Sequence, residues 1–402
     1  MQEHDVAIVG AGPAGLALGL ALARAGLGVA LADAQPEAAL AAPAEDGREI
    51  ALTHPSIALL QRLGIWQHLR AHEIGRIRSA RVVDGPHAHA ALQFAAPAAR
   101  GPAALGAIVA NQALRRASFA QARATPGITL LGGMRATAVR TLARHAELEL
   151  ASAEGAPQRL QARLLVAADS RLSPTRRQLG VGAALQDFGR SMVVCRMRHA
   201  VAHGETAHEC FGYARTLAVL PLVGDVSSVV LTTDAADAQA LMALPEAGFA
   251  ALVQEQFDAR LGAMALATPR HLYPLVGVYA ERFAGHRFAL AGDAAVGMHP
   301  VTAHGYNLGL QGVRSLAAVL QAAHAAGQDI GSAAVLRPYA RRHRAETALL
   351  YHGTNAVARL YASATPAQRL LRQAVLRGAE RLAPLKWAIT RQLTGGATTA
   401  GW

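Results

Sequence analysis

Short apolar runs separated by glycine and proline open the chain in the pattern of a strand–helix–strand unit. Asp5 to Val9 predicts a buried strand, Leu16 to Ala25 predicts a helix that Gly26 ends, and Gly28 to Ala32 predicts a second strand. The apolar run is long enough to span a bilayer, but its glycines and its proline break it into short elements. No positively charged stretch precedes it, so we expect neither a membrane span nor a secretory signal.

Strand-like and helix-like segments continue beyond this unit. A loop is expected from Pro36 to Gly47 and a helix from Pro55 to Leu63. Alternating or continuous apolar runs predict further strands at 128–131, 146–150, 162–168, 192–195, 217–221, 227–232 and 288–291. After Val313 the apolar residues recur at helical spacing. We therefore expect an α/β chain with a β-rich middle part and helices toward its C-terminal end.

Composition narrows the class of protein. Of the 402 residues, 52% are hydrophobic and 16% are charged, which excludes a disordered, collagen-like or coiled-coil chain. The net charge of +12 would suit an anionic partner, but the basic residues are nearly all arginine and no nucleic-acid-binding motif is present, so we expect no nucleic acid. Cys195 and Cys210 are too few for a disulfide framework or a four-ligand zinc site. We expect reduced thiols, a cytoplasmic protein and no metal.

The turn after the first strand has the glycine spacing of a dinucleotide-binding site. Gly10 permits the tight turn, Gly12 lets the backbone approach a pyrophosphate, and Gly15 lets helix and strand pack closely. The helix that follows offers free N–H groups to the phosphates. Asp33 ends the second strand, where a carboxylate accepts hydrogen bonds from an adenosine ribose. The alternative is a glycine-rich turn that only packs two elements.

Two later segments favour FAD over NAD as the dinucleotide. Asp169 follows a buried strand, and Gly292-Asp293 follows another. An acid in that place can hold the hydroxyls of a ribityl chain. The glycine-rich stretch from Gly305 to Leu310 then opens a helix whose N–H groups would face the N1–C2=O edge of a flavin, which gains negative charge on reduction.

Together these segments resemble the class A flavoprotein aromatic hydroxylases of the para-hydroxybenzoate hydroxylase type. The closest likeness is to the ubiquinone-biosynthesis ring hydroxylases. The N-terminal glycine motif carries it, together with the D-x-x-x-S-x-x-R stretch from Asp169 to Arg176 and the G-D segment followed by His299-Pro300. Arg48 to Leu52, Leu63 to Trp66, and a Y-x-R-R tail motif beginning at Tyr339 extend the resemblance over nearly the whole chain.

The resemblance implies a fold and a domain division. We expect a Rossmann-like FAD-binding domain of the GR2 type, a substrate domain with a mixed β-sheet, and a C-terminal helical region. The FAD-binding domain would be discontinuous, at 1–80, 103–182 and 272–330. The substrate domain would comprise 81–102 and 183–271, and the C-terminal helices 331–402.

The resemblance also assigns residues to the cofactor. The glycine motif and Asp33 would bind the ADP half of FAD, and Arg48 would approach the pyrophosphate or the flavin edge; the alternative is that Arg48 is an ordinary solvated arginine. Asp169 and Arg176 match a segment that serves both flavin and reductant, and Asp293 would hold the ribityl chain. The full expected cofactor site is Gly10, Gly12, Ala14, Gly15, Asp33, Arg48, Asp169, Arg176, Gly292, Asp293, Pro300, Gly305, Tyr306 and Asn307.

Candidate catalytic residues lie in the stretch beside the expected flavin ring: His299, Pro300, His304 and Gly305. A general-base role for either histidine competes with the simpler interpretation that this stretch shapes the backbone around the ring. Ala303 and His304 stand where the subgroup usually has Gly and Gln, and this version resembles the branch that hydroxylates 5-demethoxyubiquinol.

One departure from the family pattern concerns the flavin segment. Ser170 replaces the glycine of the family's D-G pair. A serine tolerates this position if its φ is negative, and flavin binding should then survive, whereas contact with a nicotinamide donor is put in doubt.

The implied activity is that of a monooxygenase. FAD, reduced by NAD(P)H or another transient donor, would take up O2 as a C4a-hydroperoxide and hydroxylate the ring of a polyprenylated ubiquinone precursor of the 5-demethoxyubiquinol type. A dehydrogenase or reductase of similar fold, a halogenase, and a non-catalytic flavoprotein scaffold of a lipid-biosynthesis complex are the alternatives. A halogenase is disfavoured because no Trp-x-Trp pair is present.

The C-terminal stretch from Gln368 to Leu393 is basic and amphipathic. It contains five arginines and Lys386 against the single acid Glu380. Such a segment suits anionic lipid headgroups, so peripheral contact with the inner face of the membrane is expected alongside membership of a ubiquinone-biosynthesis complex. The equally weighted alternative is a helix packed on the flavin domain.

Overall fold

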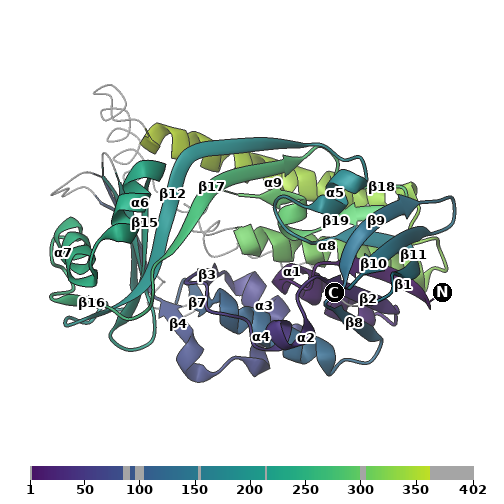
Figure 1. Ribbon diagram of the computed structural model, residues 1–402, viewed down its shortest axis with the longest axis horizontal. Coiled ribbons are helices and arrows are strands. Elements are labelled where there is room, and N and C mark those ends of the chain that lie inside the picture. The colour runs from purple at the N-terminus through teal and green to yellow at the C-terminus, as the bar shows by residue number, and fades with distance from the viewer. Residues whose placement is uncertain are drawn as a thin grey trace.

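The computed structural model describes residues 2–84, 91–95, 104–152, 155–212, 215–298 and 305–362. The molecule is elongated, with a largely parallel sheet and its helices at one end and a second sheet, antiparallel except for the parallel pair β13 (Thr206–Phe211) and β5 (Ser79–Asp84), at the other (Figure 1). The expected α/β class is confirmed. The long strands β12 (Ala183–His199) and β17 (His271–Ala280) run side by side from one end toward the other (Figure 1).

The first sheet contains the predicted strand–helix–strand unit. It consists of β1 (Gln2–Val9), α1 (Pro13–Ala23) and β2 (Val29–Asp33), and the two strands are parallel. Val6 and Ile8 on one face of β1 and Ala7 and Val9 on the other are all buried, as expected for a strand covered on both faces. The strand order is β18 (Ala284–Gly285), β19 (Phe288–Leu290), β11 (Gln158–Ala167), β1, β2 and β8 (Ile128–Gly132), with β10 (Ala146–Ala151) and β9 (Arg135–Thr141) attached to β11 as an antiparallel meander.

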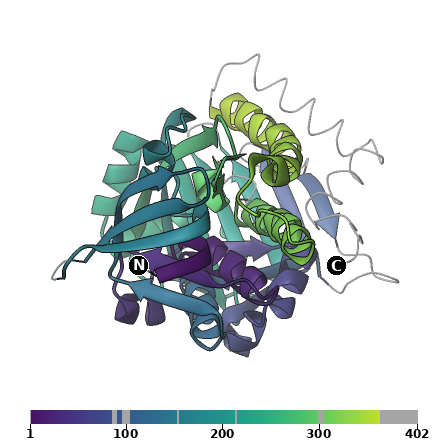
Figure 2. The same ribbon diagram turned by 90° about the vertical axis from the view of Figure 1, so that its right-hand side faces the viewer.

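Helices cover this sheet and form the main core with it. The central helix α1 packs against α4 (Asn111–Arg123) and α8 (Gly305–Ala325), and α8 packs in turn against α9 (Ala333–Ala362). Seen from the end that carries the N-terminus, the green α8 and yellow-green α9 lie together to one side of the strands (Figure 2). Gly19 makes a close helix–strand approach, because a Cβ there would lie 2.7 Å from the side chain of Leu31.

The second sheet has one face against helices and the other toward the first half of the molecule. Its order is β20 (Val296–Gly297), β17, β12, β15 (Val226–Asp234), β14 (Thr216–Pro221), β13 (Thr206–Phe211), β5 (Ser79–Asp84) and β6 (Ala91–Ala95), with β16 (Met264–Leu266) on β12. Val193, Cys195 and Met197 on β12 project to the outer face and pack with α6 (Ala235–Ala243) and α7 (Glu246–Gln256). Because side chains alternate along a strand, the intervening residues of β12 face inward.

A small sheet and several short helices connect the two halves. The small sheet has the order β3 (Glu49–Leu52), β7 (Gly106–Ala110) and β4 (Ile74–Ile77). The remaining elements are α2 (Glu37–Ala41), α3 (His54–Arg62), η1 (Trp66–His68), η2 (Ala71–Glu73), α5 (Pro174–Gln178) and η3 (Gly292–Ala294).

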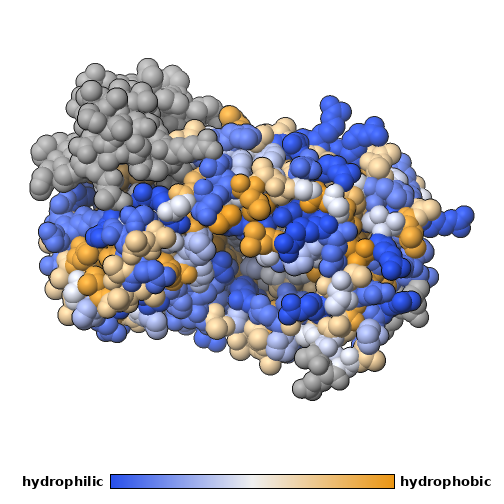
Figure 3. Space-filling model, turned by 45° about the horizontal axis from the view of Figure 1, so that its top comes forward, coloured by the Kyte–Doolittle hydropathy of each residue, from blue (hydrophilic) through white to orange (hydrophobic). Residues whose placement is uncertain are grey.

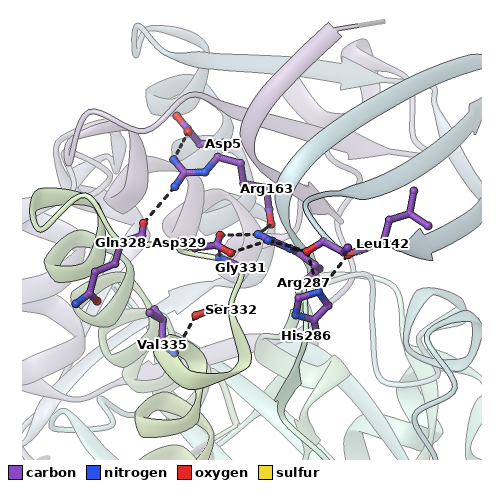
Figure 4. A network of polar contacts seen from close by, with 11 residues as sticks. Asp5, Leu142, Arg163, His286, Arg287, Gln328, Asp329, Gly331, Ser332 and Val335 are labelled. Carbon is purple, nitrogen blue, oxygen red and sulfur yellow. Dashed lines mark hydrogen bonds and ion pairs between the residues drawn. The ribbon is translucent and has the colours of Figure 1, made fainter.

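A polar network ties the turn between α8 and α9 to the first sheet (Figure 4). Arg287 is 4% exposed and forms a two-pronged ion pair with Asp329, at 2.5 and 2.6 Å. The same guanidinium donates to the carbonyls of Ala143 and Arg163, and Arg163 pairs with Asp5 on β1 at 3.1 Å. These contacts lie at the end of the molecule away from the second sheet, so they hold the fold together and are not part of the candidate site.

The structure corrects one expectation about elements and extends another. The expected loop from Pro36 to Gly47 contains the short helix α2, because alanines without a helix breaker fill its middle. The predicted strand at 192–195 is confirmed as part of the much longer β12. The expectation that the stretch from Gly305 opens a helix is confirmed, since α8 begins there. Among the described residues no helix is both long and apolar enough to cross a bilayer.

Candidate functional site

A cavity of about 690 Å³ lies between the two halves, and its lining has two parts. One part consists of the glycine turn after β1, the ends of β2 and β11, the Gly292-Asp293 segment and the start of α8. The other part is the inward face of the second sheet. Figure 3 shows the surface hollowed near the middle of the face turned toward the viewer.

The glycine turn is shaped for close backbone contact. Gly10 has a φ of +110°, and a Cβ there would collide with the carbonyl of Ala168 at the end of β11. Gly15 packs against the carbonyl of Gly10, which leaves no room for a side chain. A Cβ on Gly12, by contrast, would meet no protein atom within 4 Å. Gly12 lines the cavity at the N-terminus of α1, so an anion could approach the free N–H groups there.

Asp33 joins the second strand to this turn. Its Oδ2 accepts a hydrogen bond from Ala11 N at 2.8 Å, and its Oδ1 accepts one from Gln35 N at 2.8 Å. The carboxylate lines the cavity and has lone pairs left for further donors, because an ionised carboxylate can accept about four hydrogen bonds. This position fits a carboxylate that accepts from ribose hydroxyls.

The segment after β11 is organised around Asp169. Its Oδ2 accepts from Thr175 N at 3.0 Å and its Oδ1 accepts from the Ser173 hydroxyl, so the carboxylate caps α5 while also lining the cavity. Arg176 lies outside the lining and is 3% exposed. It donates to the carbonyls of Arg171 and Ala294, each at 3.1 Å, and therefore ties this segment to η3.

Ser170 differs from the expectation that its φ would be negative. Its φ is +128°, a conformation that glycine adopts readily and that L side chains rarely adopt. The reason is local: the chain must turn sharply between the end of β11 and the cap of α5, and the family's glycine would satisfy that turn without strain. Serine here is exposed and lines the cavity.

The Gly292-Asp293 segment and the start of α8 form another part of the cavity wall. Gly292 has a φ of +59°, and a Cβ there would lie 3.0 Å from the Cβ of Ala14, so the two segments touch. Asp293 pairs with Arg171 at 3.2 Å and lines the cavity. Gly305 also lines it, and a Cβ added there would meet no protein atom within 4 Å.

Two neighbours of Gly305 have distinct surroundings. Tyr306 lines the cavity, and its buried hydroxyl has no hydrogen-bond partner among the described residues. Burial raises the pKa of this phenol. Asn307 does not line the cavity; its amide donates to Ala51 O at 2.8 Å and accepts from Thr53 N at 3.0 Å, which fixes the start of α8 to β3. The predicted residues His299, Pro300 and His304 lie outside the described residues.

Arg48 belongs to a cluster at the cavity's rim. It pairs with Asp46 at 2.6 Å and stacks over the ring of Tyr273, 5.4 Å from its centre. Burial would raise the pKa of Asp46, but hydrogen bonds and charge from Arg48, together with a bond from Asn111, outweigh burial and hold that pKa below its usual value. Arg48 therefore lines the cavity while the ionised carboxylate of Asp46 holds its guanidinium in place.

The inward face of the second sheet forms a chamber that we call the ring chamber. Register places Val194, Val230, Ala218 and Glu209 in one row across four strands. The chamber is lined by apolar and polar residues of this sheet: Arg190, Met192, Val194, Glu209, Phe211, Thr216, Ala218, Leu220, Ser228, Val230 and Thr232. A mostly apolar chamber of this kind suits an aromatic ring.

Sequence reasoning missed two acids of the cavity, Glu209 and Glu49. Glu49 on β3 pairs with Arg196 at 2.8 Å, and burial, opposed by that arginine, raises its pKa to about 7. Burial raises the pKa of Glu209 to about 8. The available signal was that Glu209 shares one side of a strand-like stretch with Ala207 and Phe211, but the sequence indicated neither bounds nor a partner for that strand.

The cavity fits a flavin dinucleotide by its own features. Added Cβ atoms at Gly12 and Gly305 would project into open space, as expected where a ligand takes the place of side chains. Tyr306 also lines the cavity, and its hydroxyl is buried without a partner among the described residues. Of the expected cofactor residues, the described ones that line the cavity are Gly10, Gly12, Ala14, Asp33, Arg48, Asp169, Gly292, Asp293, Gly305 and Tyr306.

Comparisons with known proteins agree with this geometry. Residues 3–350 match the family model described as FAD binding domain. The chain is 44% identical to the ubiquinone hydroxylase UbiM of Neisseria meningitidis, over 98% of this chain and 86% of the relative. It is 36% identical to the ubiquinone hydroxylase UbiL of Rhodospirillum rubrum, over 97% and 89%. Among solved structures, p-nitrophenol 4-monooxygenase from Pseudomonas putida superposes with a TM-score of 0.80 at 20% identity, covering 99% of this chain and 100% of that one.

Proposed function

The chain belongs to the FAD binding domain family as an FAD-dependent monooxygenase, and we propose that it hydroxylates the aromatic ring of a polyprenylated ubiquinone precursor. The observation that carries this proposal is the single cavity in which the dinucleotide cradle opens onto the ring chamber. A flavin bound in the cradle would present its ring to an aromatic substrate held against the second sheet.

Each half of the cofactor has its own set of residues in this proposal. The glycine turn and Asp33 hold the ADP half, while Asp293, Gly305 and Tyr306 lie along the ribityl chain and the flavin ring. Arg176 and Asn307 position these segments through backbone hydrogen bonds. When bound, FAD supplies the activated oxygen for the reaction, with electrons from NAD(P)H or a similar donor.

The protein's own contribution is to exclude water and to orient the ring. The chamber walls from Met192, Val194 and Val230 are apolar, which shields a reactive oxygen species from solvent protons. We also propose an FAD-binding domain at 1–80, 103–182 and 272–330, a substrate domain at 81–102 and 183–271, and C-terminal helices at 331–402. All strands of the first sheet fall within the proposed FAD-binding segments, whereas β20 and nearly all of β17, in the segment 272–330, pair within the second sheet.

A polyprenylated substrate is nearly insoluble in water, so the enzyme must collect it from a bilayer or from a lipid-binding partner. We therefore propose peripheral contact with the inner face of the membrane or with a ubiquinone-biosynthesis complex. The basic segment from Gln368 to Leu393 supports this by its composition, and it lies outside the described residues.

The experiment that tests the proposed function compares Gly305→Leu with Gly353→Leu. Gly305 lines the cavity, whereas Gly353 lies exposed on α9; at neither position would a Cβ meet a protein atom within 4 Å. Reductant oxidation, O2 uptake, peroxide release and hydroxylated product are measured in parallel, with a short-tailed prenylated phenol as substrate. We expect Gly305→Leu to retain FAD through the ADP half but to lose coupled product, and Gly353→Leu to behave as wild type.

Two outcomes would contradict the proposal. Coupled product at the wild-type rate in Gly305→Leu would show that this stretch does not line the flavin. Oxidation of the reductant by wild-type protein without O2 uptake or hydroxylated product, but with transfer to a quinone, would identify a reductase of the same fold.

A further inference from the structure

Glu209 faces the ring chamber without a hydrogen bond or ion pair to any of the described residues. Along β13 the side chains alternate, so Glu209 and Phe211 line the cavity while His208 projects to the opposite face. There the His208 ring meets Phe257 edge-on, 5.1 Å between centres. The acid is therefore directed into the chamber by the register of its strand.

The surroundings of Glu209 are apolar on both sides. Its neighbour on β14 is Ala218 and its neighbour on β5 is Val82. Among the described residues it is the only acid that the second sheet contributes to the cavity lining. Besides Glu209, the charged residue that the described part of this sheet contributes to the lining is Arg190, which donates to Thr232 O at 3.1 Å. The remaining charged residues of the lining come from elements of the flavin side: Asp33, Arg48, Glu49, Arg115, Asp169, Arg171 and Asp293.

A half-buried carboxyl that faces a cavity without a protein partner is partly desolvated, and no protein hydrogen bond offsets that cost. A ligand that donates a hydrogen bond to this carboxylate would supply the partner. A hydroxyl on the aromatic ring of the substrate is such a partner, because it can donate to the carboxylate while the ring packs against the apolar wall. Among the described residues of the second sheet, Glu209 is also the one acid that could reach a ring held in this chamber.

We propose that Glu209 binds a ring hydroxyl of the aromatic substrate and accepts its proton as the ring is hydroxylated. This inference rests on the proposed function. The hydroxyl O–H bond breaks, its proton moves to a carboxylate oxygen of Glu209, and the electron pair stays on the substrate oxygen. That oxygen donates electron density into the ring, so a ring carbon ortho or para to it forms the new bond to oxygen.

The remaining atoms balance through the known cofactor chemistry. One oxygen atom of O2 enters the ring, the ring carbon then releases its hydrogen as a proton, and the two electrons of the donor reduce the second oxygen atom to water. Glu209 returns its proton to solvent or to the product oxygen at the end of the cycle.

The pKa of Glu209 suits the acceptance of a proton from a ring hydroxyl. A phenol titrates near 10, and a base is most effective when its own pKa lies near the working pH. Burial raises the pKa of Glu209 to about 8, so proton transfer from a phenol is far less uphill than to an ordinary carboxylate. The working form is the carboxylate, and turnover should therefore rise with pH through about 8.

The test compares Glu209→Gln with Glu255→Gln in the FAD-loaded full chain. Glu255 is exposed on α7, on the outer side of the same sheet, so the same change there alters neither the chamber nor the cofactor. The probes are a phenol with one methoxy group and one isoprene unit, and its O-methyl ether, which has no proton to give. Binding of each is followed by the change in flavin absorbance, and kcat is measured from pH 6 to pH 9.

At pH 9, where Glu209 is ionised and can only accept hydrogen bonds, we expect wild-type protein and Glu255→Gln to bind the phenol at least about tenfold more tightly than the ether, which has no proton to donate. Glu209→Gln should lower kcat on the order of a hundredfold and remove the rise of kcat with pH, with FAD content unchanged. Glu209→Ala should bind phenol and ether equally.

The failures of the two proposals are distinguishable. If wild-type protein forms product while Glu209→Gln keeps the wild-type kcat and pH profile, or if Glu209→Ala still prefers the phenol, the role of Glu209 is refuted and the monooxygenase stands. If wild-type protein binds the phenol but forms no hydroxylated product with O2 and a donor, the proposed function fails, whatever the variants do.

Discussion

Replacing Ser170 with glycine should stabilise the protein. The serine holds a φ of +128°, and a residue with a side chain in such a conformation carries a strain of about 1–3 kcal/mol. Glycine removes the strain but adds freedom to the unfolded chain, which costs about 0.5–1 kcal/mol. No hydrogen bond of the Ser170 hydroxyl to another described residue would be lost. The net expectation is a gain on the order of 1 kcal/mol in the free energy of unfolding.

The assay is the urea midpoint of the FAD-loaded protein at a fixed FAD concentration, because bound cofactor itself stabilises the fold. Ser152→Gly is the matched control: Ser152 lies in a loop and is not among the residues of positive φ. There glycine relieves nothing, and the midpoint should fall. A fall of similar size in both variants would show that the backbone at Ser170 is not strained and would refute the reasoning.

Three further predictions concern the cofactor, the acid of the ring chamber and the membrane. Asp293→Ala should release FAD from the purified protein by removing the acceptor of the ribityl hydroxyls; protein that keeps its flavin after dialysis would contradict this. The pKa of Glu209, raised from 4.5 to about 8, means that the folded state binds a proton more readily than the unfolded state between those values. Stability is therefore lost as pH rises through this window, and Glu209→Gln should be the more stable protein above pH 8, by several kcal/mol at about 1.4 kcal/mol per pKa unit, and equal to wild type below pH 4.5. Equal urea midpoints of both proteins at pH 9 would refute that shift. Neutralising the arginines of the basic C-terminal segment should weaken binding to anionic liposomes by about 1 kcal/mol per charge that lies at the surface, and unchanged binding would favour the packed-helix alternative; the positions are Arg369, Arg372, Arg377 and Arg381.

The dinucleotide cradle could be predicted from the sequence because its signals are local. Gly10, Gly12 and Asp33 carry their meaning in short spacings around one turn, and the structure brings all three to the cavity. The sequence also indicated the positions of Gly292 and Gly305, because Gly292 follows a buried strand and Gly305 opens a helix.

The ring chamber could not be predicted in the same way. Glu209 becomes part of a site only through the pairing of β13 with β14, and that register is set by long-range contacts that no short window of sequence contains. The backbone at Ser170 shows the same limit, because the family's glycine indicates a positive φ but the serine in its place does not. The hydrogen bond that Arg176 donates to the carbonyl of Ala294 likewise joins segments more than a hundred residues apart, so no short window of sequence contains it.

Oxygen insertion into an aromatic ring at this cavity can be tested with an isotope. The FAD-loaded protein is supplied with NAD(P)H, ¹⁸O2 and a short-tailed prenylated phenol, and the mass of the product is determined. We expect a hydroxylated ring that carries one heavy oxygen atom, formed in step with oxidation of the donor. A product without the heavy label, or donor oxidation that ends only in peroxide, would contradict it.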